Sequence, residues 1–132
     1  MPTRRSRVRP PLPAPKKFMS DLFNKKCAPC EGGVVPFNVS EIHKYQKKVD
    51  GWDVVKNEAN IYLLEKKFTF KNFLESLNFV NEVGKVSEQE GHHPDISFGW
   101  GYAKINITTH AIEGLSENDF ILAAKIDKII NV

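Results

Sequence analysis

The sequence predicts an α+β protein in which a four-stranded antiparallel sheet carries three helices on one face, in the order α-β-β-α-β-β-α. Two pairs of segments alternate apolar and polar side chains, as antiparallel hairpins do. A long segment between them has the apolar spacing of a helix, and a capping box opens another helical segment near the C-terminus. At 132 residues, with 41% hydrophobic and 27% charged residues, the chain has the size and composition of one globular domain.

We expect the first helix over residues 40–49. Ser40 is a residue type that caps helix N-termini, Glu41 places an acid in the first turn, and Gly51 ends the segment. A strand should then begin at Trp52.

The first hairpin and the long helix come next. Residues 61–70 should form the second strand, with residues 57–60 as the connecting turn. Residues 72–90 should form a helix with two apolar stripes, which is more apolar surface than one sheet face covers. The stripes consist of Phe73, Leu77 and Val80, and of Phe79, Val83 and Val86. A homo-oligomer through this helix is therefore expected.

The second hairpin should comprise residues 95–100 and 103–109, joined by a turn at Gly101 and Tyr102. Its alternation places Ala103, Ile105 and Ile107 on one face and Lys104, Asn106, Thr108 and His110 on the other. Ser116 to Asp119 form a capping box for the last helix. The expected apolar side of that helix consists of Phe120, Ala123, Ala124, Ile126 and Ile130.

Residues 1–37 are expected to be a disordered basic arm and a loop, and residues 38–132 the folded domain. Residues 1–26 contain eight basic residues and one acid, Asp21, so they carry +7 of a net charge of +3 and leave −4 for the rest. The mildly acidic body argues against direct nucleic-acid binding. The arm is either a plain solvated tail, a partner-dependent arm or an organelle transit peptide, although its prolines interrupt an amphipathic helix.

Cys27 and Cys30 form a single Cys-x-x-Cys with no second pair, so a four-ligand zinc site is not completed locally. Bracing of the loop is favoured over a redox or metal role. No apolar run approaches the roughly 18 residues that span a bilayer. We expect a protein without membrane contact in the cytoplasm, or in an organelle if the arm is a transit peptide.

Three of the four histidines lie near the outer ends of the second hairpin: His92, His93 and His110. Regular pairing about the predicted turn places residue 110 roughly opposite residue 93, so three imidazoles can share one cleft. Two acids are within reach, Glu88 one helical turn before His92 and Asp119 in the first turn of the last helix.

Three interpretations of these histidines remain open, namely surface residues, metal ligands or acid/base groups. Adjacent residues of a strand point to opposite faces, so His92 and His93 make an awkward chelating pair. For Asp119, capping is favoured over catalysis, because an acid is stabilising at the third position of a helix.

The run Glu88-Gln89-Glu90-Gly91-His92-His93-Pro94-Asp95, with Thr109-His110, Gly114-Leu115-Ser116 and Asp119, closely resembles the pattern of the pterin-4a-carbinolamine dehydratases. The resemblance covers about residues 41–130. It implies a hydro-lyase that converts 4a-hydroxytetrahydropterin to quinonoid dihydropterin and so recycles tetrahydrobiopterin, without metal or organic cofactor. It further implies that His92, His93 and His110 are catalytic, and that the pterin substrate is bound or shaped by Glu88, Pro94, Thr109, Ala111, Ile112 and Asp119.

The same resemblance leaves non-catalytic alternatives open. Animal members of the family also bind a homeodomain transcription factor, and some bacterial relatives are assembly chaperones for the carbon-fixing carboxylase. A binding module of that kind would act through the long helix. The resemblance also implies a homodimer or a homotetramer.

Overall fold

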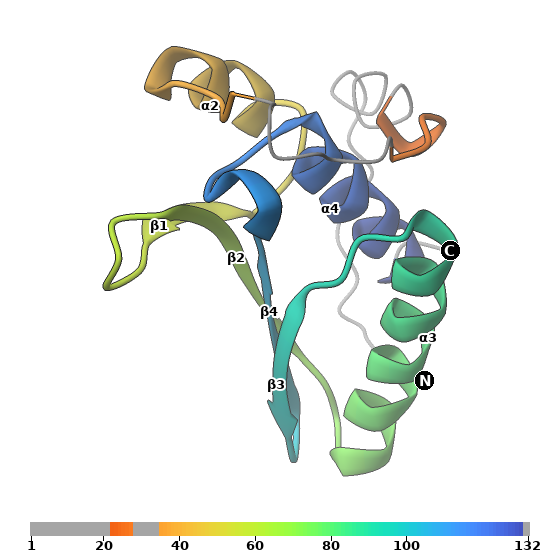
Figure 1. The fold of residues 1–132 in the computed structure, drawn as a ribbon. Coiled ribbons are helices and arrows are strands. Elements are labelled where there is room, and N and C mark those ends of the chain that lie inside the picture. Colours follow the sequence, from red (N-terminus) through yellow and green to blue (C-terminus); the bar gives the residue numbers. More distant parts are fainter. Residues whose placement is uncertain (1–21, 28–34, 131–132) are drawn as a thin grey trace.

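The structure is a computed structural model that describes residues 22–27 and 35–130. Within these residues it has a four-stranded antiparallel sheet of order β1-β2-β4-β3, with its helices on one face (Figure 1). The elements are α2 (Val39–Gln46), β1 (Asp53–Lys56), β2 (Tyr62–Thr69), α3 (Phe73–Glu90), β3 (Asp95–Gly99), β4 (Tyr102–Ile107), the 3₁₀ turn η1 (His110–Ile112) and α4 (Glu117–Ile130). The predicted fold class and element order are confirmed.

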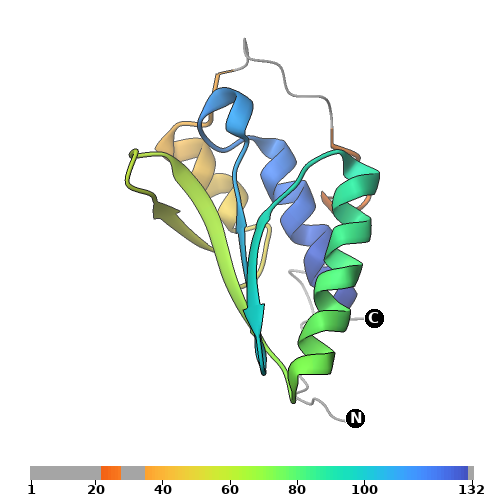
Figure 2. The same ribbon diagram turned by 60° about the horizontal axis from the view of Figure 1, so that its bottom comes forward.

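The core lies between the sheet and the helices α3 and α4, which run side by side on one face (Figure 2). The apolar residues of β4 that the alternation assigned to one face, Ala103, Ile105 and Ile107, are completely buried. Helix α4 is buried on nearly all sides, although Ile130 at its end is 40% exposed rather than part of its apolar side. Lys66 of β2 and Asp127 of α4 form an ion pair of 2.8 Å within this layer.

Helix α2 begins one residue earlier than the sequence predicted, and its N-cap lies two residues earlier. Its N-cap is Asn38, whose side chain accepts the backbone N–H of Glu41, while the Glu41 carboxylate accepts the backbone N–H of Asn38. This reciprocal pair satisfies two otherwise unpaired donors, so Asn38 displaces Ser40 as the cap. The helix ends at Gln46, well before Gly51.

The second hairpin has a different register from the predicted one. Gly99 pairs with Tyr102, so the two-residue loop is Trp100 and Gly101, and Gly101 takes the positive φ of 81° that the loop needs. Asp95 pairs with Asn106. Extending this register places residue 108, not residue 110, opposite residue 93.

Part of the segment before residue 38 packs against the domain. Leu22 and Cys27 are 2% and 8% exposed and belong to the core cluster, and the backbone N–H of Phe37 donates to the Leu115 carbonyl. The predictions for residues 1–20 and for Cys30 lie outside the described residues. No helix in the described part of the chain is long and apolar enough to cross a membrane.

Helix α3 has one buried and one partly exposed apolar stripe. Phe79 and Val83 are buried against the core, whereas Phe73 and Leu74 are 47% and 61% exposed. Asn72 caps the helix by accepting the backbone N–H of Glu75. The start of α3 therefore presents apolar side chains to solvent. Its end leads into the segment that carries two of the histidines.

Candidate active site

A cleft of about 240 Å³ lies where the end of α3, the turn η1 and the start of α4 meet. All three histidines singled out in the sequence line it. The complete lining is Gly91, His92, His93, Thr108, Thr109, His110, Ala111 and Asn118. The expected shared cleft is therefore present, although His110 reaches it by a route that the sequence did not predict.

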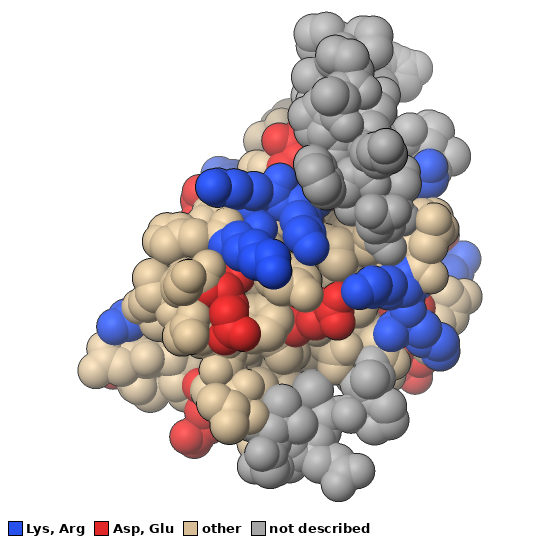
Figure 3. All heavy atoms as spheres, turned by 90° about the horizontal axis from the view of Figure 1, so that it is seen from above, with Lys and Arg blue, Asp and Glu red and all other residues tan. Residues whose placement is uncertain are grey.

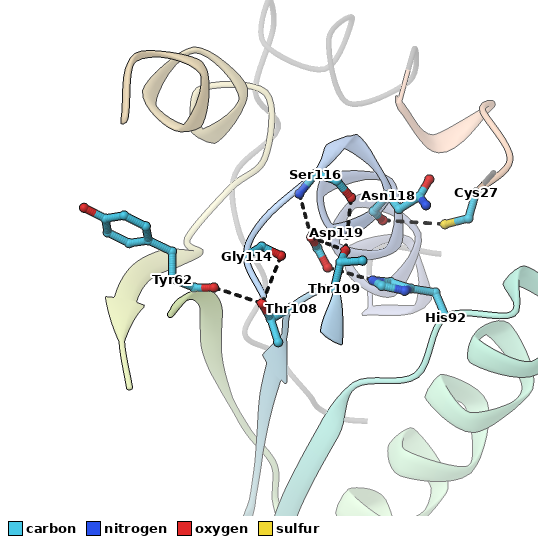
Figure 4. Close-up of polar contacts among 9 residues, drawn as sticks. All are labelled: Cys27, Tyr62, His92, Thr108, Thr109, Gly114, Ser116, Asn118 and Asp119. Carbon is cyan, nitrogen blue, oxygen red and sulfur yellow. Dashed lines mark hydrogen bonds and ion pairs between the residues drawn. The ribbon is translucent and has the colours of Figure 1, made fainter. Parts of the chain in front are cut away.

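The position of His92 follows from the way α3 ends. Gly91 caps the helix with a left-handed backbone, φ 65°, which turns the chain out of the helical path at low steric cost. The backbone N–H of His92 then donates to the Ser87 carbonyl at 3.2 Å. This terminus fixes the backbone of His92 and directs its mostly buried side chain toward the start of α4 (Figure 4).

The His92 imidazole contacts a buried carboxylate. Nε2 of His92 lies 2.7 Å from Oδ1 of Asp119, and the Asp119 side chain is fully buried. The other oxygen, Oδ2, accepts the Thr109 hydroxyl and the Ser116 backbone N–H, both at 2.8 Å. Figure 4 shows these contacts converging on Asp119. Asp119 therefore caps α4 and holds a histidine at the same time.

The His93 imidazole has an exposed partner instead. Its Nε2 lies 2.5 Å from Oε2 of Glu88, and the two side chains are 61% and 78% exposed. The expectation that Glu88 contacts a histidine thus applies to His93. Because water surrounds both groups, this pair is held much less firmly than the buried one.

His110 is presented by a short closed loop after β4. The backbones of Thr109 and Gly114 pair with each other, through N···O distances of 2.9 and 3.4 Å, and η1 occupies the residues between them. Thr108 tightens the loop because its hydroxyl also contacts the Gly114 carbonyl at 3.2 Å. The loop brings the exposed His110 to the cleft without any strand pairing to residue 93.

The remaining predicted residues divide into two groups. Ala111 is exposed and lines the cleft, whereas Ile112 is buried behind it and Pro94 is half-buried beside β3 without lining it. The lining residues that the sequence reasoning missed are Gly91, Thr108 and Asn118. Thr108 could have been identified from the sequence, because the predicted alternation places it on the same polar face as His110. Asn118 could not, because it lies within the predicted capping box.

A second polar cluster adjoins the cleft behind Asn118. The Cys27 thiol donates to the Asn118 carbonyl, and the Cys27 backbone N–H donates to Oε1 of Glu90 at 2.8 Å. Burial, followed by the neighbouring Glu90 carboxylate, raises the pKa of the Cys27 thiol to about 12. Lys125 contacts the other oxygen of Glu90 at 3.0 Å. A protonated, buried thiol braces this wall of the cleft, which agrees with the structural interpretation of Cys27.

On the face shown in Figure 3, Asp and Glu side chains lie among the Lys and Arg side chains, so this surface has no uniform sign. Within residues 22–27 and 35–130, no group of three or more His, Cys, Asp or Glu side chains is arranged to hold a metal ion.

Comparison with models of known protein families shows the family to which the chain belongs. Residues 35–129 match the model of the family described as pterin 4 alpha carbinolamine dehydratase. The chain belongs to this family. The match includes both hairpins, all three cleft histidines and the buried Asp119, so the described cleft lies within the family domain.

Relatives in this dehydratase family cover most of the chain. Proteins from Rubrobacter xylanophilus and Methylococcus capsulatus, both named "Putative pterin-4-alpha-carbinolamine dehydratase", are each 47% identical to it, over 111 and 108 residues. These matches cover 84% and 82% of this chain and 100% and 92% of the relatives.

Two solved structures have the same fold. A transcriptional coactivator/pterin dehydratase from Brucella melitensis aligns with a TM-score of 0.64 and 24% identity, over 71% of this chain and 97% of that one. A pterin dehydratase-like protein identified as a RuBisCO assembly factor in the alpha-carboxysome aligns with a TM-score of 0.52 and 26% identity, over 60% and 88%.

Proposed function

We propose that the protein is a dehydratase that converts a 4a-hydroxytetrahydropterin to the quinonoid dihydropterin and water by histidine acid/base catalysis. The observation that carries this proposal is the convergence of His92, His93 and His110 on one cleft. Membership of the pterin carbinolamine dehydratase family supports the choice of substrate. The recycling of tetrahydrobiopterin would follow from the same reaction.

The reaction needs one base and one acid. A base takes the proton from N5, the C4a–O bond breaks as an acid protonates the departing hydroxyl, and a double bond forms between C4a and N5. Water is the only other product, and no electrons are exchanged with a partner. Imidazole suits both tasks because its unperturbed pKa lies close to neutrality.

The structure offers distinct settings for these two tasks. His92 is held by a buried carboxylate, so its ring has a defined orientation. His93 and His110 are exposed at the cleft and can exchange protons with solvent. A residue with a fixed ring suits proton abstraction at one position, and exposed residues suit proton delivery and the return of protons to water.

The test is stopped-flow absorbance of 4a-hydroxytetrahydropterin decay, with the wild type and the His92→Ala/His110→Ala double variant, in the presence of a chelator. The wild type should accelerate decay with the chelator present, and the double variant should lose most of that acceleration. His43→Ala is the matched control, because His43 is an exposed histidine of α2 that does not line the cleft. No acceleration by the wild type contradicts the proposal.

A second proposal is binding through α3, with a further copy of the chain as the first partner to test. The observation that favours it is the exposure of Phe73 and Leu74 near the start of α3, together with Trp100, which is 71% exposed at the tip of the second hairpin. Large exposed apolar side chains of this kind are candidates for an interaction surface. A monomer by light scattering at micromolar concentration contradicts self-association, and Leu74→Lys should dissociate any oligomer that forms there.

A further inference from the structure

Both oxygens of the Asp119 carboxylate have hydrogen-bond partners. It is fully buried, its Oδ2 accepts the Ser116 backbone N–H and the Thr109 hydroxyl, and its Oδ1 lies 2.7 Å from Nε2 of His92. Because a backbone N–H can only donate, the contact with Ser116 requires Oδ2 of Asp119 to be an acceptor. Two donors therefore converge on Oδ2 of this buried side chain, which favours an ionised carboxylate, an acceptor only.

The ionised carboxylate fixes the hydrogen on His92. Because Asp119 only accepts, the contact with His92 requires a hydrogen on Nε2. In the neutral imidazole the lone pair then resides on Nδ1. Among the described residues, the structure gives Nδ1 of His92 no hydrogen-bond partner, and the His92 side chain lines the cleft. Nδ1 is therefore the basic nitrogen of this residue.

Thr109 contributes to this arrangement from the wall of the cleft. It is only 3% exposed, its hydroxyl donates to Asp119, and the same oxygen lies 3.0 Å from the Ser116 hydroxyl. Both contacts of the hydroxyl thus point into the protein. We propose that Thr109 is a positioning residue that orients Asp119, so that Asp119 holds His92 with its hydrogen on Nε2 and with Nδ1 as the base. This inference rests on the proposed dehydratase function for its catalytic meaning, whereas the hydrogen-bond chain itself is a property of the free protein.

The first test measures the free protein and needs no turnover. In the ¹H–¹⁵N NMR spectrum of histidine side chains, the Nε2–H of His92 should give a downfield, slowly exchanging signal, assigned by its loss in His92→Ala. Thr109→Val removes the hydroxyl at nearly constant shape, and exchange of this proton should become at least tenfold faster or broaden the signal away. Thr109→Ser restores a hydroxyl and should restore the signal. Thr69→Val, an exposed threonine at the end of β2, should change nothing.

The second test separates positioning from substrate contact. Thr109→Val should lower kcat about tenfold with KM within about twofold, and Thr109→Ser should recover most of the loss, since only the serine variant restores the hydrogen bond to the carboxylate. Thermal unfolding of each variant identifies any loss of the folded state, and the comparison is then made below the lowest Tm. A raised KM with an unchanged His92 signal overturns the proposal, as does an Nδ1–H signal in the wild type. If the wild type shows no turnover, the dehydratase function fails while the NMR result still decides the hydrogen-bond chain.

Discussion

The adjacent residues His92 and His93 each pair with a carboxylate, and the two pairs differ in their exposure to solvent. In the pair of His92 and Asp119 the side chains are 12% and 0% exposed, and two further donors support the carboxylate. In the pair of His93 and Glu88 they are 61% and 78% exposed. Similar interatomic distances therefore describe one rigid and one solvent-screened interaction.

The end of α3 therefore has a buried side, where polar side chains are held in place, and an exposed side, where they contact water. On the buried side, the Glu90 carboxylate accepts the Cys27 backbone N–H and binds Lys125 of α4, much as Asp119 holds His92. On the exposed side, Glu88 faces water. Rigidity at the cleft thus comes from carboxylates that are both buried and fully hydrogen-bonded.

The largest effect is expected at Cys27, on the buried side. Burial and Glu90 raise the pKa of its thiol to about 12, so at pH 8 only about one thiol in ten thousand is a thiolate. Iodoacetamide should alkylate Cys27 about a thousandfold more slowly than an unperturbed thiol at pH 8. Mass spectrometry of the Cys30→Ser variant measures this rate, because Cys27 is then the sole thiol. Reaction as fast as in urea contradicts the buried brace.

Replacement of the buried carboxylate should have the next largest effect. Asp119→Ala leaves the Thr109 hydroxyl, the Ser116 N–H and the His92 imidazole without their acceptor, and unpaired buried polar groups are costly. We expect the free energy of unfolding in urea to fall by about 3 kcal/mol.

The matched comparison for Asp119→Ala is Glu117, a partly exposed acid in the first turn of the same helix. Glu117→Ala removes a carboxylate that contacts Lys25 at the surface, where the side chains are 36% and 53% exposed. It should change the unfolding free energy by less than about 1 kcal/mol. Equal losses in the two variants would show that helix capping, rather than the buried network, explains the effect of Asp119.

Single histidine substitutions should have smaller but clear effects on catalysis. His92→Ala and His110→Ala should each lose at least about tenfold in turnover with the fold intact, because each proposed acid or base contributes directly to the barrier. Stopped-flow absorbance measures the rate, and far-UV circular dichroism checks the fold. Full activity in both variants removes the acid/base assignment.

The strands were predictable from sequence because burial imposes a period of two on them. Ala103, Ile105 and Ile107 alternate as expected and are completely buried. The hairpin register was not predictable in the same way, because the apolar alternation continues through Trp100, which in the structure is a solvent-exposed loop residue. A pattern of apolar residues does not distinguish the last strand residue from the first loop residue.

The site was predictable as a group of residues but not as a set of contacts. The spacing of the histidines indicated a shared cleft, and the carboxylates near them were visible in the sequence. For Asp119, capping was favoured over catalysis, and the sequence did not indicate that its two carboxylate oxygens would cap the helix and contact a histidine at the same time. Which histidine each acid meets depends on the path of the chain after Gly91, and residue spacing alone does not give that path.

The smallest effect is expected at the exposed pair, and it is the sharpest test of the comparison. Glu88→Gln keeps the size of the side chain and removes its charge, so only the electrostatic part of the contact with His93 is lost. Because both groups are mostly in water, the unfolding free energy should change by less than about 0.5 kcal/mol, and 1 M salt should remove even that difference. Asp119→Asn, measured alongside by urea denaturation, should lose several times more stability and keep that loss in salt. If Glu88→Gln proves as costly as Asp119→Asn, solvent exposure is not what separates the two pairs, and the rigid role assigned to the buried one loses its physical basis.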